Sequence, residues 1–148
     1  MSRILVLQGA NMNWLGIREP EKYGTTTASQ LDDMIRRHAQ ERGYEVEIAY
    51  CNIEGEAIER LYEAHRQSVD AVVLNPGGFS YAGYALRDCM VGIKVPVVEI
   101  HLTNHYVRGI HSVTAAAAKG IILGLGIDGY LLALDAALRL VRKSAPAS

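Results

Sequence analysis

The chain has 148 residues, and its 15 Lys and Arg nearly balance its 16 Asp and Glu, for a formal net charge of -1. One domain over residues 1–148 is expected from this length, and the charge balance argues against a nucleic-acid or acidic-membrane partner. No stretch is apolar over the roughly 18 residues that a membrane-spanning helix requires. Cys51 and Cys89 are the only cysteines, without a CxxC pair or a secretory signal. We therefore expect reduced thiols and a cytoplasmic location.

The first part of the chain predicts a strand, a long polar segment and a helix. Residues 4–7 are apolar and typical of a buried strand, whereas residues 9–27 contain glycines and Pro20 without a helical or strand period. Because long loops in compact domains are usually functional lids or disordered segments, we expect a lid loop at about residues 16–25. Thr27 and Gln30 have the spacing of a capping box, and apolar residues at helical spacing predict a helix that ends at Gly43.

The rest of the chain alternates strand and helix patterns. Residues 45–50 alternate charged and apolar side chains, which indicates an edge strand, and further strands are predicted at 71–74, 95–100 and 120–123. Helical spacing predicts helices at 54–67, at 84–90 and from about residue 127, with a frayed tail at 144–148. Five strands alternating with helices predict an α/β fold, a flavodoxin-like doubly wound parallel sheet with helices on both faces.

Polar residues gather in the loops that follow three of these strands. The carboxyl ends of parallel strands share one edge of the sheet, so these loops predict a binding site at that edge. No GxGxxG, GxxxxGK[ST] or HExxH motif is present, and His101 and His105 have no further ligand nearby, so we expect no metal site. The loops carry Asn11, Asn13, Arg18, Glu19 and Tyr23, then Asn75, Ser80 and Tyr81, then Glu99, His101, Thr103, Asn104, His105 and Arg108.

These side chains are suited to proton transfer without a metal. Tyr23 would act as a base if the guanidinium of Arg18, in the same loop, favoured its phenolate. His101, held by Glu99 or by a backbone carbonyl, would act as the acid.

Asn11 and Asn75 complete the set, because their amides would orient an enolate oxygen or a water. Together these groups favour abstraction of a proton next to a carbonyl and expulsion of a hydroxyl. The same residues also fit structural roles: Tyr23 as an anchor of its loop, Asn75 as a cap of the turn at Pro76, and His101 as a core histidine.

Several stretches resemble the type II 3-dehydroquinate dehydratase (dehydroquinase) family, and together they cover nearly the whole chain. They are Gly9–Gly16 with Arg18-Glu19-Pro20 and Tyr23-Gly24, Asn52–Glu56, Asn75–Gly78, Ala85–Asp88, Glu99–Asn104, Lys119-Gly120, Gly124–Gly126 and Gly129–Leu134. The resemblance implies a flavodoxin-like fold, a homododecamer built as a tetramer of trimers, and no cofactor. It also implies anti elimination of water from 3-dehydroquinate, through an enolate, to give 3-dehydroshikimate in the shikimate or quinate pathway.

The resemblance also implies a role for each matching residue. Tyr23 would take the C2 proton beside Arg18, while Asn11 would hold a water that stabilises the enolate. His101, oriented by Glu99, would protonate the leaving C1 hydroxyl. The substrate-binding residues would be Asn75, Tyr81, Arg108 and the backbone amides of Leu102 and Thr103, with Asp88 reaching the site of a neighbouring subunit.

Two features depart from the family pattern. Tyr81 stands where the family usually has a histidine, and the segment 104–112 is shortened and keeps only Arg108 of two arginines. The missing His and Arg contact ring hydroxyls of the substrate in the family. Two alternatives therefore stay open: a dehydratase-like paralogue that acts on a related hydroxylated ring acid, and a non-catalytic binding or structural paralogue.

Overall fold

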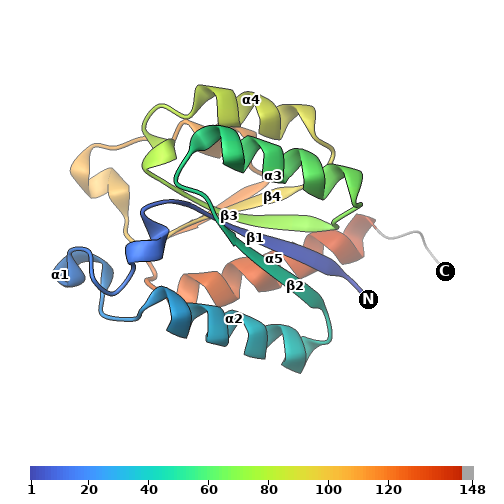
Figure 1. Ribbon diagram of the computed structural model, residues 1–148, viewed down its shortest axis with the longest axis horizontal. Coiled ribbons are helices and arrows are strands. Elements are labelled where there is room, and N and C mark those ends of the chain that lie inside the picture. Colours follow the sequence, from blue (N-terminus) through green and yellow to red (C-terminus); the bar gives the residue numbers. More distant parts are fainter. Residues whose placement is uncertain (145–148) are drawn as a thin grey trace.

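The structure is a computed structural model in which residues 1–144 are described. Its elements are β1 (Arg3–Ala10), α1 (Pro20–Tyr23), α2 (Ala28–Arg42), β2 (Glu45–Tyr50), α3 (Glu54–Arg66), β3 (Ala71–Gly77), α4 (Tyr84–Gly92), β4 (Val97–His101), β5 (Gly120–Leu123) and α5 (Asp128–Ser144). The strands are parallel and form one sheet in the order β2-β1-β3-β4-β5. Helices α2 and α5 cover one face, and α3 and α4 cover the other (Figure 1). The predicted flavodoxin-like doubly wound sheet is confirmed.

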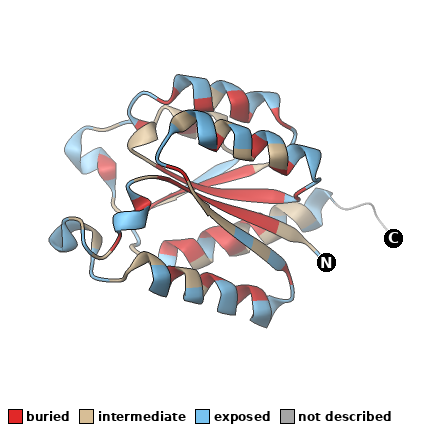
Figure 2. Cartoon of the chain, in the orientation of Figure 1, coloured by how far each residue is buried: buried red, intermediate tan, exposed pale blue. Residues whose placement is uncertain are grey.

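The central strands supply side chains to two apolar cores, one on each face of the sheet. Ile4 and Val6 of β1 pack in the layer of α2 and α5, whereas Leu5 and Leu7 pack in the layer of α3 and α4. All four are buried, and the middle of the sheet is accordingly the most deeply buried part in Figure 2. Side chains alternate between the faces of a strand, so burial on both faces explains the continuous apolar run in the sequence.

The start of α2 has the predicted capping box. Thr27 Oγ1 accepts a hydrogen bond from Gln30 N at 3.1 Å, and Gln30 Oε1 accepts one from Thr27 N at 2.9 Å. The helix ends before Gly43, also as predicted. Strand β2 lies at the edge of the sheet, which explains its alternation of charged and apolar residues.

Two strands extend further toward the polar loops than their apolar runs predict. β1 continues to Ala10 and β3 continues to Gly77, where these two residues are paired. A Cβ on Gly77 would lie 2.3 Å from the carbonyl oxygen of Ala10, so only glycine permits this close approach of the backbones. The extension carries the loop residues to the carboxyl edge of the sheet.

Two other segments also differ in the structure from what the sequence pattern indicates. The 9–27 segment, which has no helical period in the sequence, contains a 3-10 turn at Met12–Trp14 and the short helix α1, which begins at Pro20. Proline suits the first position of a helix because its φ is already fixed there. Ser144, the first residue of the predicted frayed tail, is the last residue of α5 and donates from Oγ to Val141 O at 3.0 Å, and the fraying itself stays a prediction. The remaining residues of that tail, 145–148, lie outside the described residues.

Candidate active site

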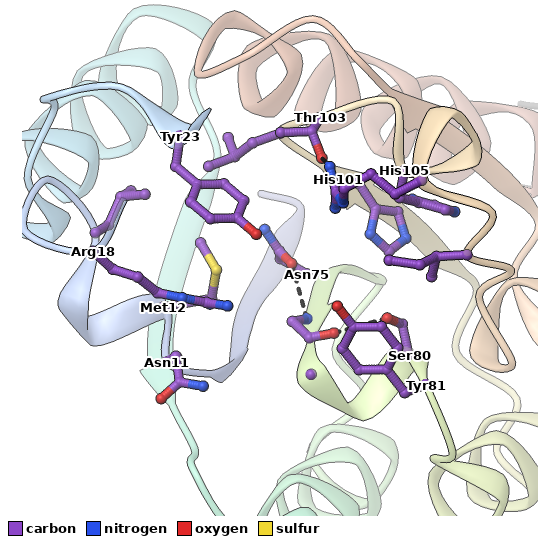
Figure 3. Close-up of a pocket in the computed structure, with 16 residues that line it drawn as sticks. Asn11, Met12, Arg18, Tyr23, Asn75, Ser80, Tyr81, His101, Thr103 and His105 are labelled. Atoms are coloured by element: carbon purple, nitrogen blue, oxygen red, sulfur yellow. Dashed lines mark hydrogen bonds between the residues drawn. The ribbon is translucent and has the colours of Figure 1, made fainter. Parts of the chain in front are cut away.

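A pocket lies at the carboxyl edge of the sheet, where the segments after β1, β3 and β4 meet (Figure 3). This is the edge that the sequence predicts. Most of the predicted site residues line it: Asn11, Arg18, Tyr23, Asn75, Tyr81, His101, Leu102, Thr103 and Arg108. Two do not, because Glu99 lies behind His101 and Asp88 lies on α4.

The buried carboxylate of Glu99 holds His101 in place. Glu99 Oε2 lies 2.7 Å from His101 Nε2 and accepts a hydrogen bond from Ser112 Oγ at 2.7 Å. The hydroxyl of Thr114 donates to the other carboxylate oxygen. A carboxylate only accepts hydrogen bonds, so the contact with Glu99 places a hydrogen on His101 Nε2 and leaves Nδ1 outside this pair. The arrangement predicted for this pair is therefore present.

A second imidazole lies against the first. The rings of His101 and His105 meet edge to face with their centroids 4.5 Å apart. Burial, with a further contribution from His101, lowers the pKa of His105, so this side chain is held neutral. His105 Nε2 is buried and has no hydrogen-bond partner among residues 1–144. The sequence places His105 in this loop, but its position against His101 comes only from the structure.

Asn75 at the end of β3 is buried and hydrogen-bonded at both amide atoms. Its Oδ1 accepts from Gly77 N at 3.0 Å, and its Nδ2 donates to the hydroxyl of Tyr130 at 2.8 Å. Asn75 thus caps the turn after β3 and lines the pocket at the same time. The structural and the functional interpretations of this residue are compatible.

Tyr23 faces the pocket from helix α1, on the other side from His101. Its hydroxyl points toward the centre of the pocket in Figure 3, in the direction of Asn75. The Arg18 guanidinium carbon lies 5.0 Å from the centroid of the Tyr23 ring, so the cation covers the face of the phenol. Glu19 Oε2 lies 3.7 Å from Arg18 Nε and contributes to its position. The structure therefore brings Arg18 and Tyr23 together, as the sequence predicts.

The segment after β4 supplies both backbone and side-chain groups. Leu102 and Thr103 follow His101 directly and line the pocket. Arg108, in the 3-10 turn His105–Arg108, donates from a guanidinium nitrogen to Thr103 Oγ1 at 3.0 Å. The single arginine kept in the shortened segment therefore lies at the pocket, beside the residues predicted to bind a carboxylate.

Two polar residues lie at the margins of this arrangement. Asn11 has a left-handed backbone with φ of 68°, which its backbone N–H donation to Asn52 Oδ1 at 2.8 Å holds in place. Tyr81 lines the pocket and is 57% exposed, so its phenol can reach a bound molecule without leaving a core. Asp88 lies on α4 with an exposed side chain, outside the pocket lining, and its predicted role beside a neighbouring subunit stays a prediction.

Some pocket residues carry no polar signal in the sequence. Met12, Leu15 and Ile110 are apolar and line the pocket, where they exclude water from its walls. Thr114 stands directly before the alanines 115–118, and its hydroxyl reaches Glu99 from behind the pocket. Within residues 1–144, no group of three or more His, Cys, Asp or Glu side chains is placed to hold a metal ion, and no helix is long and apolar enough to cross a membrane.

The model of the dehydroquinase class II family matches residues 2–138 of this chain. A 3-dehydroquinate dehydratase of Marinobacter nauticus is 44% identical over 146 residues, covering 97% of this chain and 100% of that protein. One of Thioalkalivibrio sulfidiphilus is 41% identical over 147 residues, with 97% and 100% covered. The crystal structure of the type II dehydroquinase of Butyrivibrio crossotus has a TM-score of 0.88 at 36% identity and covers 93% of this chain and 97% of that one. This chain belongs to the class II dehydroquinase family.

Proposed function

We propose that the protein is a 3-dehydroquinate dehydratase, which eliminates water from 3-dehydroquinate to give 3-dehydroshikimate. The observation that carries the proposal is that Tyr23 and His101, a candidate base and a candidate acid, line one pocket from two different segments. The full-length relatives named 3-dehydroquinate dehydratase give independent support for the substrate. They also favour this function over the alternatives raised by Tyr81 and the shortened 104–112 segment.

The proton path follows from this arrangement. The Tyr23 phenolate takes the C2 proton, and the electron pair of that bond moves into the enolate of the neighbouring ketone. The positive charge of Arg18 lies 5.0 Å from the centroid of the Tyr23 ring, on the side of the pocket where this proton transfer takes place. A water held by Asn11 stabilises the enolate oxygen.

The second half of the reaction breaks the bond between C1 and its hydroxyl. The enolate electrons form the new double bond, and protonated His101 gives its proton to the departing hydroxyl, which leaves as water. Glu99 holds the imidazole in position through the contact at Nε2. A proton must then pass from Tyr23 to His101 through solvent to restore the starting state.

The remaining groups bind the substrate. The backbone N–H groups of Leu102 and Thr103 bind the carboxylate, and Asn75 positions the C1 hydroxyl near His101. Tyr81 and Arg108 contact the other ring hydroxyls. No cofactor is needed, because side chains carry out both proton transfers and the electrons of the enolate expel the C1 hydroxyl.

We further propose that the protein is a cytoplasmic homododecamer, a tetramer of trimers, in the shikimate or quinate pathway. The outer face of α4 supports an intersubunit contact, since Tyr84, Asp88 and Val91 are all exposed on it. Asp88 would approach the site of the neighbouring subunit there. Light scattering coupled to size exclusion should give about twelve times the chain mass of 16.2 kDa, and a monomer would contradict this part of the proposal.

Turnover of 3-dehydroquinate is the direct test. We expect absorbance from the conjugated enone to grow after the substrate is added to the purified protein. Analogues that lack or move one ring hydroxyl should react much more slowly, because unpaired polar groups in the site then cost affinity. No turnover by well-folded protein at high concentration would contradict the proposal, and a faster reaction with an analogue would favour the related ring acid.

A further inference from the structure

Behind Asn75, buried polar groups cross the apolar core between the sheet and α5. The Tyr130 hydroxyl of α5 accepts a hydrogen bond from Asn75 Nδ2 at 2.8 Å and donates one to Gln8 Oε1 of β1 at 2.7 Å. Tyr130 and Gln8 are both 0% exposed, and neither lines the pocket. Buried polar groups cost free energy unless they are hydrogen-bonded, and an apolar side chain would fill the same space without that cost.

The direction of each hydrogen bond in this network follows from one backbone group. Gly77 N–H can only donate, so the Asn75 atom that it contacts at 3.0 Å is the amide oxygen. The Asn75 amide nitrogen then faces Tyr130, and because that nitrogen can only donate, the Tyr130 oxygen must accept. The single hydrogen of Tyr130 is therefore left for Gln8, whose amide oxygen accepts it.

The chemistry of Tyr130 keeps this direction fixed. Burial raises the pKa of the Tyr130 phenol above its usual range, so the phenol stays neutral and retains the hydrogen that Gln8 accepts. A neutral hydroxyl with its hydrogen engaged presents only a lone pair to Asn75. Rotation of the Asn75 amide by half a turn would set oxygen against oxygen at Tyr130 and nitrogen against N–H at Gly77.

We propose that Tyr130, supported by Gln8, is a positioning residue that locks the Asn75 amide with a nitrogen hydrogen available to the pocket. One Nδ2 hydrogen is used by Tyr130, and the other remains for an oxygen of the bound molecule. Asn75 thus acts on the substrate as a hydrogen-bond donor. This inference rests on the proposed dehydratase function, in which that oxygen is the C1 hydroxyl that leaves.

A double-mutant cycle tests whether Tyr130 acts through Asn75. Tyr130→Phe removes one hydroxyl, and we expect kcat to fall by about tenfold while KM changes by less than about twofold. In an Asn75→Ala background the same substitution should change kcat by less than about twofold, since the group that it positions is gone. An equal loss of kcat in both backgrounds would overturn the proposal.

Tyr44→Phe is the matched control. Tyr44 is also buried, at 5% exposed, and its hydroxyl lies 2.7 Å from His38 Nδ1 beside the amino end of β2, at the edge of the sheet opposite the pocket. Loss of this hydroxyl should leave kcat unchanged. A fall in kcat equal to that of Tyr130→Phe would show a general effect of losing a buried hydroxyl and would overturn the proposal.

A second measurement does not depend on activity. The side-chain amide signals of Asn75 in nuclear magnetic resonance spectra can be assigned by their loss in Asn75→Ala. We expect these hydrogens to exchange slowly with solvent in the wild-type protein and faster in Tyr130→Phe. Equal exchange in both proteins would overturn the locking role even if the wild type is an active dehydratase. If the Asn75 amide hydrogens exchange more slowly in the wild type than in Tyr130→Phe but the wild type does not turn over 3-dehydroquinate, the locking role is supported and the proposed function is contradicted.

Discussion

The two walls of the pocket differ in how firmly their polar groups are held. On the strand-end wall, Asn75 and His101 are buried and hydrogen-bonded to protein partners, and the buried Glu99 lies behind His101 as its partner. On the wall formed by residues 16–25, Arg18 and Tyr23 are partly exposed, and the contact between them is that of a cation over a ring.

This difference separates the two proposed proton-transfer groups. The acid, His101, is preorganised by packing and hydrogen bonds before any substrate binds. The base, Tyr23, belongs to a short helix that few buried contacts hold, as expected of a segment that closes over a ligand. Substitutions on the strand-end wall should therefore affect both stability and activity, whereas those in the 16–25 segment should affect activity with little change in stability.

The largest effect is expected from Tyr23→Phe. Loss of the proposed base should lower kcat by about 100- to 10,000-fold. The unfolding free energy should change by less than about 0.5 kcal/mol, because the side chain is partly exposed. Enone absorbance and urea denaturation measure the two quantities. A variant with full activity would remove Tyr23 from the mechanism, and a strongly destabilised one would show that the two walls are equally firm.

Two glycine substitutions compare the backbones of the two walls. Gly77→Ala would place Cβ 2.3 Å from Ala10 O at a φ of +55°, which should cost about 3 kcal/mol or more of unfolding free energy. Gly24→Ala has a similar backbone restriction, with a φ of +87°, but no atom lies within 4 Å of the new Cβ.

The expected cost of Gly24→Ala is about 1 kcal/mol or less of global stability, since the 16–25 segment can relax locally. The main effect of Gly24→Ala should instead be a raised KM or a lowered kcat. Urea denaturation of both variants decides between these expectations. Equal destabilisation by the two substitutions would contradict the difference between the walls.

Glu99→Gln should affect stability and activity together. The amide keeps the shape of the side chain but replaces one acceptor oxygen with a donor facing groups that donate to Glu99. We expect a loss of about 1–3 kcal/mol in unfolding free energy, together with a fall in kcat. Glu47→Gln, at an exposed residue of β2, is a matched control that should change neither quantity strongly. Normal stability in Glu99→Gln would weaken the case for a preorganised wall.

The smallest effect concerns the pH dependence of stability. Burial lowers the pKa of His105 in the folded protein below its ordinary value of 6.5, so between those two values the unfolded chain binds more protons. Stability should therefore rise with pH through that interval and level off above it. His105→Leu lacks this contribution. Chemical denaturation should therefore show a smaller difference in unfolding free energy between acid and neutral pH for this variant than for the wild-type protein. An unchanged difference would indicate that His105 is not held neutral by the fold.

The sequence predicts the fold and much of the candidate site for a simple reason. Apolar periodicity reports which face of a strand or helix is buried, and in a parallel sheet the loops after the strands meet at one edge. Tyr23 and His101 are thus identifiable as polar residues in loops that packing does not explain. The sequence does not predict α1, because four residues are too few to show a helical period.

The sequence by itself therefore determined the sheet, its active edge and the set of polar groups available there. Only the tertiary structure decided how those groups pair. Tyr130 reads as one more member of an apolar helical face and Gln8 follows the strand predicted at residues 4–7, yet Tyr130 meets Asn75 across 55 residues of chain and Gln8 across 122. Hydrogen bonds depend on the distance and direction between particular atoms, which a periodic pattern does not contain, so their partners are known only after the core is assembled.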